Sequence, residues 1–589
     1  MRCAVMLILE KIMVLIAWPQ PAGRSCRPER CGRRGMTVND SVQATSGLES
    51  RGAPGEPSPR WHHGVRPVLW IVLIMVLAGC TMVGPDFVKP DPPVLDQWQQ
   101  ADDAILALKP AERIQWWEAF DDPVLSNLIE TAYQNNYSLK IAGLRVLEAR
   151  AQLGIAVGNL YPQNQQANGG ATYTSVSKNA ANTASGDLNY WEYNVGAGVS
   201  WELDFWGRFR RAIESADASL LGSIAAYDNA LVLLVAQVAD TYVAIRTAEA
   251  QLKVARENVA IQERAVKITE ARFRGGDVGE LDVLQARTQL LGTQASFPPL
   301  ETVLQQARNA LSTLLGRPPG DLAQILGPQP GVIPAAPKAI AAGAPTELLR
   351  RRPDVRQAER AAAAQSAAVG VAEADLYPSF GLSGFLGVVA ADGTNTTRSG
   401  NSGFGQLFNS DAFTFFGGPY FSWNILNYGR IRNNVRVQDA RLQQLLVNYQ
   451  DTVLNAVREV EDSMVAFLRS REQERILAET EATAQRSLNI ANVGYREGFT
   501  DFQRVLDVQG ALLRAQQSYV TARSTTVRSA IGIYRALGGG WEIRSGSDFV
   551  DRETKDAMQR RVNWGDLLQP EATEPPIKGE GGGWPSPDW

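Results

Sequence analysis

The chain carries the same sequence pattern twice, and this internal repeat constrains its fold more than any other feature. Three matched pairs of segments define it: Leu160-Tyr161-Pro162 with Leu376-Tyr377-Pro378, Ser200-Trp201 with Ser422-Trp423, and Leu315-Gly316 with Leu537-Gly538. The offset in numbering is 216 for the first pair (160 to 376) and 222 for the other two (200 to 422 and 315 to 537). The second half therefore gains a short insertion early and nothing for a long stretch afterwards. A register that stays constant over this length predicts two copies of one rigid, periodic structure.

Each half contains a long run of apolar residues at helical spacing. Leu231, Val235, Val238, Tyr242 and Ile245 follow at intervals of 4-3-4-3, and adding 222 gives Val453, Val457, Val460, Met464 and Phe467. This heptad-like spacing predicts one long helix in each half. From Gly207 to the first break at Gly275-Gly276 the helix would be roughly 100 Å long at 1.5 Å per residue. The chain is then expected to reverse and return as a helix from Leu281 to Leu315. A solvated coiled-coil hairpin would show the same periodicity.

The segments before each long helix alternate apolar residues with polar residues or glycine. The apolar positions are Tyr193, Val195, Ala197, Val199, Trp201 and Leu203 in the first half, and Phe380, Leu382, Leu386, Val388, Phe413, Phe415, Phe421, Trp423 and Ile425 in the second. Period two predicts strands, and the polar stretches between them predict one long-looped hairpin in each half. Strands of this kind are typical of a transmembrane barrel, although a soluble hairpin packed on a core would look the same.

Four strands are too few to close a barrel, for which eight is the usual minimum. An open strand edge is also not tolerated inside a bilayer. If the hairpins span a membrane, several chains must therefore share one barrel. This argument does not choose between two chains and three.

The N-terminal region differs from the rest of the chain. Residues 1–64 are rich in arginine and lack sustained periodicity, and a short apolar run, Pro67–Gly79, follows them. The run is too short for a membrane-spanning helix but typical of a signal-peptide core. We therefore expect residues 1–64 to be absent from the mature protein, with translation starting near Val65.

The end of this apolar run resembles a lipoprotein processing site. Leu77-Ala78-Gly79-Cys80 is similar to the lipobox of bacterial lipoproteins, which implies cleavage before Cys80 and acylation of that residue. Thr81 in place of an aspartate favours the outer membrane under the sorting rules of such lipoproteins. A chance cysteine after an ordinary signal sequence is the alternative.

Composition excludes several classes of function. The net charge of -4, with 44% hydrophobic and 20% charged residues, is globular and does not favour nucleic-acid binding. After Cys80 the chain has no cysteine and no histidine. Disulfides, His/Cys metal sites, cysteine nucleophiles and histidine acid–base chemistry are therefore excluded downstream, and no cofactor is expected. An enzyme built from carboxylates, lysine or serine remains possible.

Taken together, these features resemble the outer-membrane factor family, the TolC-like and OprM-like ducts, and in particular its NodT-like lipoprotein efflux subgroup. The resemblance covers roughly residues 80–540. It is carried by Cys80–Pro90, by Ser200–Arg208, and by Glu347–Arg356 with the following Ala372–Pro378. Each segment alone is moderately specific, but their order and spacing make a chance match very improbable. Within the third segment, Arg352-Pro353-Asp354 also predicts a helix start, because proline and an acid are favoured in the first turn.

The resemblance implies an α+β membrane protein. In the family, a trimeric 12-stranded transmembrane β-barrel is continuous with a 12-helix periplasmic α-barrel, and each chain contributes a duplicated half-repeat. The implied function is the outer-membrane channel of a tripartite efflux system, a passive export duct for small molecules gated at its periplasmic tip. Its implied partners are two further copies in a homotrimer, outer-membrane lipid, a periplasmic adaptor (membrane fusion) protein and an inner-membrane pump of the proton-coupled RND type.

Three other functions remain open at this point. A type I secretion duct uses a similar channel with an ABC pump. A non-channel coiled-coil lipoprotein could tether the envelope, although a tether needs no amphipathic hairpins. A periplasmic enzyme is not supported, because the sequence shows no phosphate-binding loop, no serine nucleophile elbow and no metal-ligand cluster.

The repeat and the motifs together predict the organisation of the chain. The expected segments are an extension at 1–64, a signal peptide at 65–79, an N-terminal periplasmic segment at 80–135, a first half-repeat at 136–316, a Pro/Ala-rich linker at 317–346, a second half-repeat at 347–538 and a periplasmic tail at 539–589. Each half-repeat comprises a β-hairpin (about 160–204 and 378–426) followed by a helical hairpin (about 205–316 and 427–538). The tail is rich in Gly, Pro and charge, and we expect it to be largely disordered.

The resemblance places the gate of the duct at the helix turns farthest from the membrane. Asp507 matches one of the acidic rings of the family, whereas Arg504 stands where TolC carries a second acid. These two residues are three apart and can pair on one helix face. Tyr495 and Asp282 match positions that hold the closed tip together, but Thr500 replaces their usual basic partner.

Overall fold

The structure is a computed structural model that describes residues 82–91, 97–100, 106–107, 114–179, 188–341, 343–346, 351–392 and 403–569. All of them belong to one unit, Trp70–Trp589. The expected extension, the signal peptide and Cys80 lie outside the described residues.

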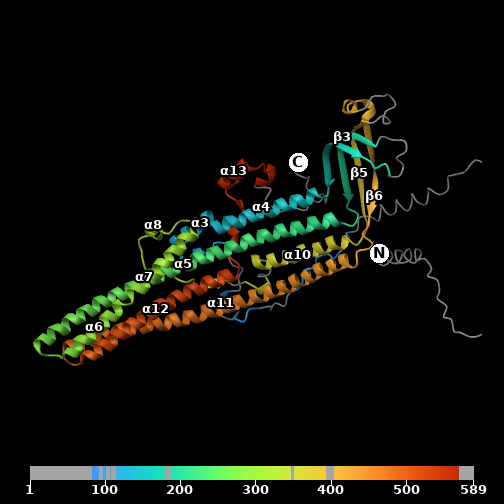
Figure 1. Ribbon diagram of the computed structural model, residues 1–589. Coiled ribbons are helices and arrows are strands. Elements are labelled where there is room, and N and C mark those ends of the chain that lie inside the picture. The colour runs from blue at the N-terminus through green and yellow to red at the C-terminus, as the bar shows by residue number, and fades with distance from the viewer. Residues whose placement is uncertain are drawn as a thin grey trace, which may run out of the picture. The chain divides into compact units, whose positions relative to one another are not determined.

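Two long helices run the length of this unit, α5 (Arg208–Gly275, 68 residues) and α11 (Arg430–Arg496, 67 residues) (Figure 1). Each begins after a glycine with a left-handed backbone, Gly207 at φ 78° and Gly429 at φ 82°. The apolar seam predicted for α5 is buried, with Leu231, Val238 and Ile245 at 0% exposure. The long helix predicted from the heptad spacing is thus confirmed in both halves.

Helix α5 is also the one helix of the described chain that could cross a membrane by length and composition alone. Half of its most apolar stretch is buried within the chain. That burial explains its composition, because it packs beside α3 (Pro123–Asn135), α4 (Tyr137–Gly158), α10 (Pro353–Ala374) and α12 (Phe502–Ala536).

The returning helices differ between the halves. In the second half α12 is continuous, whereas in the first half α6 (Glu280–Gln294) ends and α7 (Phe297–Leu314) begins. The expected single return helix from Leu281 to Leu315 is therefore wrong. Pro298 and Pro299 cannot donate a backbone hydrogen bond, so they stand in the first turn of α7. Between α6 and α7 the chain makes a tight turn, in which the Ser296 N–H donates a hydrogen bond to the Thr293 C=O at 3.1 Å.

The shorter helices repeat as closely as the long ones. Adding the first repeat offset, 216, to both bounds of α4 gives both bounds of α10 (137 to 353 and 158 to 374). The predicted helix start at Pro353 is confirmed, and Arg352 holds Asp354 through two hydrogen bonds of 3.0 and 2.7 Å.

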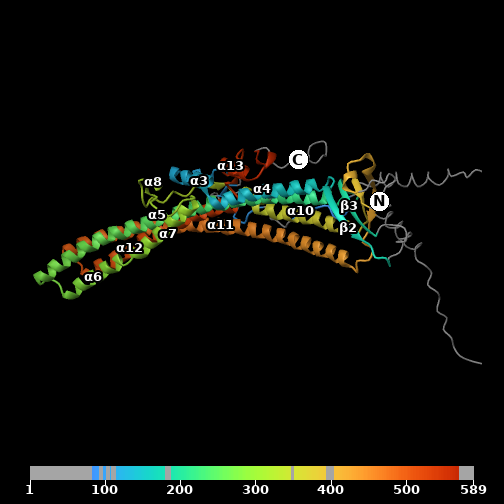
Figure 2. The same cartoon turned by 45° about the horizontal axis from the view of Figure 1, so that its top comes forward.

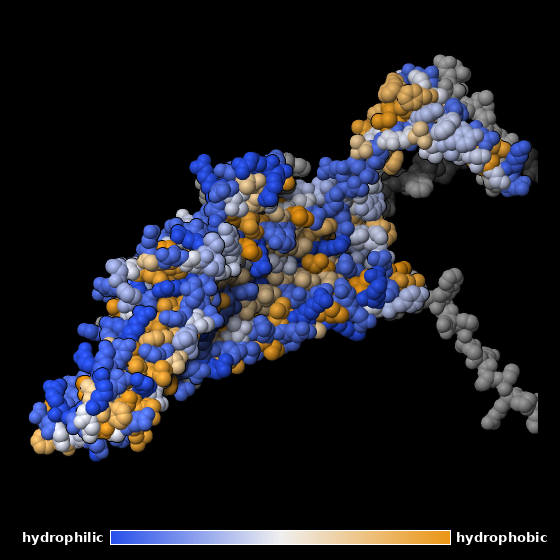
Figure 3. Space-filling view, turned by 60° about the vertical axis from the view of Figure 1, so that its left-hand side comes forward, coloured by the Kyte–Doolittle hydropathy of each residue, from blue (hydrophilic) through white to orange (hydrophobic). Residues whose placement is uncertain are grey.

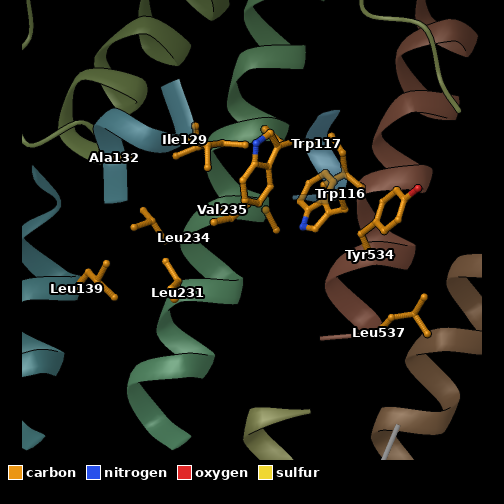
Figure 4. Close-up of a cluster of buried hydrophobic side chains, with 14 of the residues drawn as sticks. Trp116, Trp117, Ile129, Ala132, Leu139, Leu231, Leu234, Val235, Tyr534 and Leu537 are labelled. Carbon is orange, nitrogen blue, oxygen red and sulfur yellow. The ribbon is translucent and has the colours of Figure 1, made fainter. Parts of the chain in front are cut away.

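The main core lies where α3, α5 and α12 meet the 3₁₀-helix η1 (Trp116–Phe120) (Figure 4). Trp116 stacks on Tyr534 with ring centroids 5.1 Å apart and an interplanar angle of 11°. The 317–346 segment adds Leu326 and Ile340 to this core, from α8 (Ala323–Leu326) and from β4 (Ile340–Ala341), which pairs in parallel with β1 (Leu106–Ala107). The short elements η1, α3, α8, β1 and β4 therefore pack beside the middle of the long helices.

At one end the long helices carry a four-stranded antiparallel sheet in the order β2-β3-β5-β6. Its strands are β2 (Asn164–Ser175), β3 (Asn189–Leu203), β5 (Ser379–Ala391) and β6 (Phe413–Ser422), with the short helices η2 (Phe404–Gln406) and η3 (Ser410–Ala412) between the last two. The two predicted hairpins are confirmed, and the β3–β5 pairing joins the two halves. In this sheet β2 and β6 are the edge strands.

The pairing register gives the sheet two different faces. Ala197 lies opposite Leu386, and Leu386 lies opposite Phe415, so apolar positions align across the strands. Large side chains on this face are exposed, including Leu386 at 55% and Phe415 at 72%. The opposite face is more polar, with Asn194 and Ser383, and also carries the stacked pair Phe385 and Phe416. Within the described part of one chain this apolar face is largely exposed, and only at one end does Phe404 of η2 pack on Tyr193.

The C-terminal segment is ordered up to residue 569, so the prediction of a largely disordered tail is wrong for this part. It forms η4 (Trp541–Arg544), α13 (Arg552–Arg561) and η5 (Gly565–Leu568). Phe549 and Val550 are buried against the main core, and α13 lies beside α4 in both ribbon views (Figure 2). The composition predicted disorder because the few apolar residues of this segment are scattered among glycines and charged residues.

A buried carboxylate fastens this segment to α5. Asp228 is 0% exposed and accepts hydrogen bonds from Arg356 of α10, at 2.6 Å, and from Arg544 of η4. One buried charge thus joins α5, α10 and the C-terminal segment, and two guanidinium groups neutralise it.

We expect Asp228→Ala to destabilise the protein by about 3–5 kcal/mol, because two arginines are left without their carboxylate. Asp240→Ala is the matched control on the same helix. Asp240 pairs with Arg528, and both are exposed at 41% and 50%, so its loss should cost less than about 1 kcal/mol. Thermal unfolding in detergent and the rate of proteolysis within residues 541–569 measure both effects. Equal behaviour of the two variants would contradict the structural role of Asp228.

Candidate functional site

The turns of the two helical hairpins lie together at the end of the helices opposite the sheet (Figures 1 and 2). Gly276, at φ 80°, ends α5, and its counterpart in the repeat, Gly498, at φ 81°, follows α11. In the first turn Asp277 N–H donates to Arg272 C=O at 2.9 Å, which satisfies a carbonyl at the helix end. Both turns therefore use a left-handed glycine at the same position of the repeat.

A small apolar cluster separate from the main core joins the two hairpins at this tip. Its buried members are Val266 of α5, Ala286 of α6, Ala491 of α11, and Phe502, Val505 and Leu506 of α12. Since all four helices contribute, the cluster holds the two hairpins of one chain together. Exposed apolar residues surround it, among them Leu281 at 65% and Phe499 at 84%, and Figure 3 shows apolar side chains gathered at this end.

A cation–π contact crosses between the hairpins beside this cluster. The Arg272 guanidinium of α5 lies 4.5 Å from the centroid of the Tyr495 ring of α11, and the Tyr495 phenol raises the pKa of that guanidinium. On its other side Tyr495 packs against Phe502, 5.4 Å between centroids. Sequence reasoning missed Arg272. A basic residue in the last turn of a helix is explained by the helix dipole alone, so nothing in the sequence marks its reach to α11.

The predicted tip residues are placed as follows. Among the residues that the structure describes, no hydrogen bond or ion pair joins Asp282 to Tyr495. Asp282 is half-buried in the first turn of α6, where an acid complements the helix dipole. Arg504 and Asp507 do not pair in the described chain, where Asp507 accepts a hydrogen bond from Gln503 at 2.9 Å. The amide of Gln503 is one turn before Asp507 and therefore reaches it along the same helix face.

Asp507 is exposed on an open groove between α6 and α12. The groove has a volume of approximately 620 Å³, and Leu281, Leu284 and Arg514 are among the residues that line it. Arg504 is exposed as well, and its backbone N–H donates to the Asp501 side chain that caps α12, at 3.0 Å. The structure thus brings Asp507 and Arg504 to the same tip without pairing them.

Above the tip, α5 and α12 meet along a seam of hydrogen-bonding side chains. The bonded pairs are Asp240 with Arg528 at 2.8 Å, Thr247 with Ser524 at 2.7 Å, Gln251 with Thr521 at 3.3 Å, and Asn258 with Gln516 at 2.7 Å. We call this the polar seam. Its α5 residues are spaced 7-4-7, an 11-residue repeat, whereas the apolar seam of α5 is spaced in heptads. The polar seam thus differs from the apolar seam of α5 both in its side chains and in its spacing.

Two glutamines interrupt the polar seam. Gln262 is 1% exposed and Gln509 is 3% exposed, and among the described residues neither polar atom of the Gln262 amide nor the Gln509 side-chain carbonyl has a hydrogen-bond partner. The Asn258–Gln516 bond above and the cluster at Val266 and Val505 below bring them to the same level of the antiparallel helices. Buried amide groups without hydrogen-bond partners cost free energy, so the polar seam contributes least to stability around Gln262 and Gln509.

The described residues define a class of fold: an α+β chain with long paired helices and a four-stranded sheet. Residues 128–317 and 344–539 match the family described as outer membrane efflux protein, one segment in each half. The chain belongs to this family, a family of channels rather than enzymes.

The chain is 30% identical over 484 residues to the probable efflux pump outer membrane protein TtgC of Pseudomonas putida, an alignment that covers 81% of this chain and 96% of that protein. It is also 30% identical to the probable outer membrane lipoprotein SilC of Salmonella typhimurium, over 80% of this chain and 98% of that protein. Among solved structures, the outer-membrane channel OprN is 33% identical, with a TM-score of 0.72 and coverage of 78% of this chain and 99% of that one. The chain is therefore the outer-membrane channel component of an efflux pump.

The unpaired glutamines lead to a test of the polar seam. We expect the double variant Gln262→Leu/Gln509→Leu to be at least as stable as the parent, because it replaces unpaired buried amides with apolar groups of similar size. Asn258→Leu on the same seam is the matched control. It removes the bond to Gln516 and should lower stability by about 1–2 kcal/mol. Thermal unfolding in detergent compares the three proteins, and a double variant less stable than Asn258→Leu would contradict this account of the seam.

Proposed function

We propose that the chain is one third of a passive export duct for small molecules, which crosses the outer membrane as a shared β-barrel and reaches into the periplasm as a tunnel of helices. The observation that carries this proposal is the four-stranded sheet, with one apolar exposed face and two edge strands, β2 and β6. An edge left open in a bilayer leaves backbone groups without partners, so the edges must pair with other copies. Three copies would supply twelve strands and six long helices with their returning helices, and the number three rests on the resemblance to the family.

The N-terminal segment supports a lipid anchor at Cys80. Its first described residues lie where β3 passes into α5: Val83 N–H donates to Trp206 C=O at 3.0 Å, and Arg211 binds Asp86 at 2.6 Å. These contacts hold the first described residues at the junction of sheet and helix, and Cys80 precedes them by two positions in the sequence. We propose that Cys80 is acylated, that residues 1–79 are removed, and that the half-repeats are the segments 136–316 and 347–538.

The tip of the hairpins is the proposed gate, formed by Asp507, Arg504, Tyr495 and Asp282. Threefold symmetry would bring three copies of Asp507 toward the axis, where converging carboxylates attract cations. The duct itself supplies no chemistry. A periplasmic adaptor and an inner-membrane pump of the proton-coupled RND type are the proposed partners, and the pump would supply the energy.

The cargo is proposed only as a class of small molecules. TtgC is named as a toluene efflux protein in one strain, CusC as a cation efflux protein and ArpC as an antibiotic efflux protein, so relatives of similar identity carry unlike cargo. A type I secretion duct is the second candidate, since a protein-exporting pump could use the same tunnel. The apolar sheet face speaks against a tether without a pore.

Planar-bilayer conductance of the purified protein, with its oligomer mass measured in the same preparation, tests the proposal. We expect a trimer that gives small, cation-selective steps. A monomer or dimer that stays silent, even after the tip is altered, would overturn the duct.

Asp507→Ala should lower the preference for cations, because it removes the carboxylate from every copy at the constriction. The permeability ratio of K⁺ to Cl⁻ is expected to fall toward one. Glu118→Ala, which removes an exposed carboxylate from η1 far along the chain from the tip, is the charge-matched control and should leave the ratio unchanged. An unchanged ratio and conductance in Asp507→Ala would remove this residue from the gate.

Arg272→Ala should loosen the closed tip. An exposed cation–π contact contributes about 0.5–1 kcal/mol, so its loss is expected to raise the open fraction about two- to fivefold. Tyr495→Phe keeps the ring and should behave like the parent, which separates the ring contact from the phenol hydroxyl. Single-channel open probability is the readout, and parent-like gating in Arg272→Ala would show that the contact has no role in closure.

A further inference from the structure

Three aromatic side chains lie on the more polar face of the sheet. Phe385 of β5 and Phe416 of β6 are directly opposite each other in the pairing register, and their rings stack with centroids 5.5 Å apart and an interplanar angle of 23°. Tyr420 follows Phe416 by four residues on β6, so its side chain is on the same face. In the proposed barrel this face lines the lumen, because the other face is apolar and suits contact with lipid.

Glycines allow these rings to lie close to the sheet. A Cβ atom added to Gly196 would lie 2.5 Å from the Phe385 ring, and a Cβ atom added to Gly387 would lie 2.7 Å from it. Gly381 is related to Tyr420 in the same way, because its Cβ atom would lie 2.5 Å from the Tyr420 ring. Glycine weakens the interior of a strand and often marks a close approach. The rings that cover these three glycines supply that close approach.

Two of the three rings remain open to solvent. Phe416 is 65% exposed and Tyr420 is 40% exposed, whereas Phe385 is half-buried. Pairing of β6 with another copy would use its backbone edge, and its side chains would still project from the face of the sheet. Phe385 therefore holds the stacked pair on the sheet, while Phe416 and Tyr420 present their rings to the lumen.

The first half of the repeat shows that the fold does not require aromatic residues at these two positions. The offset of 222 makes Asn194 the equivalent of Phe416 (416 − 222) and Gly198 the equivalent of Tyr420 (420 − 222). Both equivalents lie on β3, on the same polar face, and β3 pairs with a strand on each side. A packing requirement shared by the two halves therefore does not explain Phe416 and Tyr420. Apolar groups exposed on a polar surface mark a site of interaction.

Hydrogen-bonding groups lie between the stacked pair and Tyr420. Ser383 is directly opposite Ser200 on β3 and Gly418 on β6, so a row of small residues crosses the sheet at this level. The Tyr420 hydroxyl extends to this row, 3.3 Å from the Ser200 hydroxyl. At about 3.4 Å per residue, the backbones of Phe416 and Tyr420 are roughly 14 Å apart along β6. The row is thus a polar floor with an aromatic ring on either side, wide enough for one planar ring system.

We propose that Phe385, Phe416 and Tyr420 form a contact site for small aromatic solutes on the wall of the duct. A planar solute stacks on the exposed ring of Phe416 or Tyr420, and a hydroxyl or amine that it carries donates a hydrogen bond to a serine of the floor. The inference rests on the proposed function, because it requires this face to line the lumen. It adds a class of solute that the wall of the duct recognises.

Thiol labelling of the reconstituted protein tests the site. The chain has no cysteine after Cys80, so Ser383→Cys places a single thiol on the floor between the rings. The probes are N-phenylmaleimide and N-cyclohexylmaleimide, which are similar in size and differ in aromaticity. Relative to free N-acetylcysteine, we expect the ratio of the phenyl rate to the cyclohexyl rate to be about two- to tenfold higher, because aromatic pairs attract beyond their apolar area. The chain without Ser383→Cys gives the background labelling.

Neighbouring phenylalanines on opposite faces of β6 provide the matched variants. Phe416→Asn copies the first half of the repeat and, combined with Ser383→Cys, should lower the ratio toward that of the free thiol. Phe416→Leu keeps the apolar volume without the ring and should lower the ratio as well. Phe415→Leu removes a ring from the lipid-facing side and should leave the ratio raised. A ratio like that of the free thiol in Ser383→Cys alone, or equal ratios in the 415 and 416 variants, would overturn the site.

A charged reagent distinguishes this inference from the proposed function. Trimethylammonium-ethyl methanethiosulfonate does not enter lipid, so it should label Ser383→Cys in vesicles and leave Leu382→Cys, on the apolar face, unlabelled. Labelling of Ser383→Cys without a preference for the phenyl probe overturns the aromatic site and leaves the duct intact. Absence of labelling at Ser383→Cys, or labelling at Leu382→Cys instead, would show that this face does not line an aqueous lumen and would overturn the barrel itself.

Discussion

The burial of the apolar seam of α5 is the interaction on which the rest of the structure depends. Leu231, Val238 and Ile245 are fully buried, and the helices that cover them come from both halves and from both ends of the chain. Because α5 rises by about 1.5 Å per residue without a break, it fixes the distance between the sheet at one end and the tip at the other. Any proline or glycine pair within this helix would disturb both ends at once.

Around this axis the chain uses two kinds of helix contact. The apolar seam of α5 repeats in heptads and is buried in the main core, which excludes water. The polar seam between α5 and α12 is held by amides and hydroxyls, which can exchange partners or accept water with little net change in free energy.

Most of the fold was predictable because its long elements are governed by periodicity. The heptad spacing and the constant repeat offset depend only on local sequence, so they located α5, α11 and both β-hairpins. The break at Pro298 was missed because the second half has no proline at the equivalent position, Val520, so the repeat did not indicate it. The packing of the C-terminal segment was missed because it depends on the contact of Arg544 with the buried Asp228, which lies far away in the sequence.

At the tip, Asp507 and Tyr495 were found by resemblance, but their contacts were not. Asp507 and Arg504 have a spacing that permits a pair, yet Gln503 is also within one turn of Asp507, and spacing alone does not decide between the two. Arg272 and Tyr495 belong to different halves of the repeat, far apart in the sequence. A contact of this kind depends on which helices are neighbours, which no local pattern specifies.

The size of the tip cluster limits how readily the two hairpins of one copy can separate. Burying a large apolar side chain contributes about 1.5–3 kcal/mol, so Val266, Phe502, Val505 and Leu506 together contribute on the order of 6–12 kcal/mol. Exposing all four by thermal motion alone would populate the open state to roughly one part in 10⁴ or less, since each 1.4 kcal/mol is a factor of ten. Separation of the two hairpins within one copy therefore requires a partner that binds the parted tip better than the closed one.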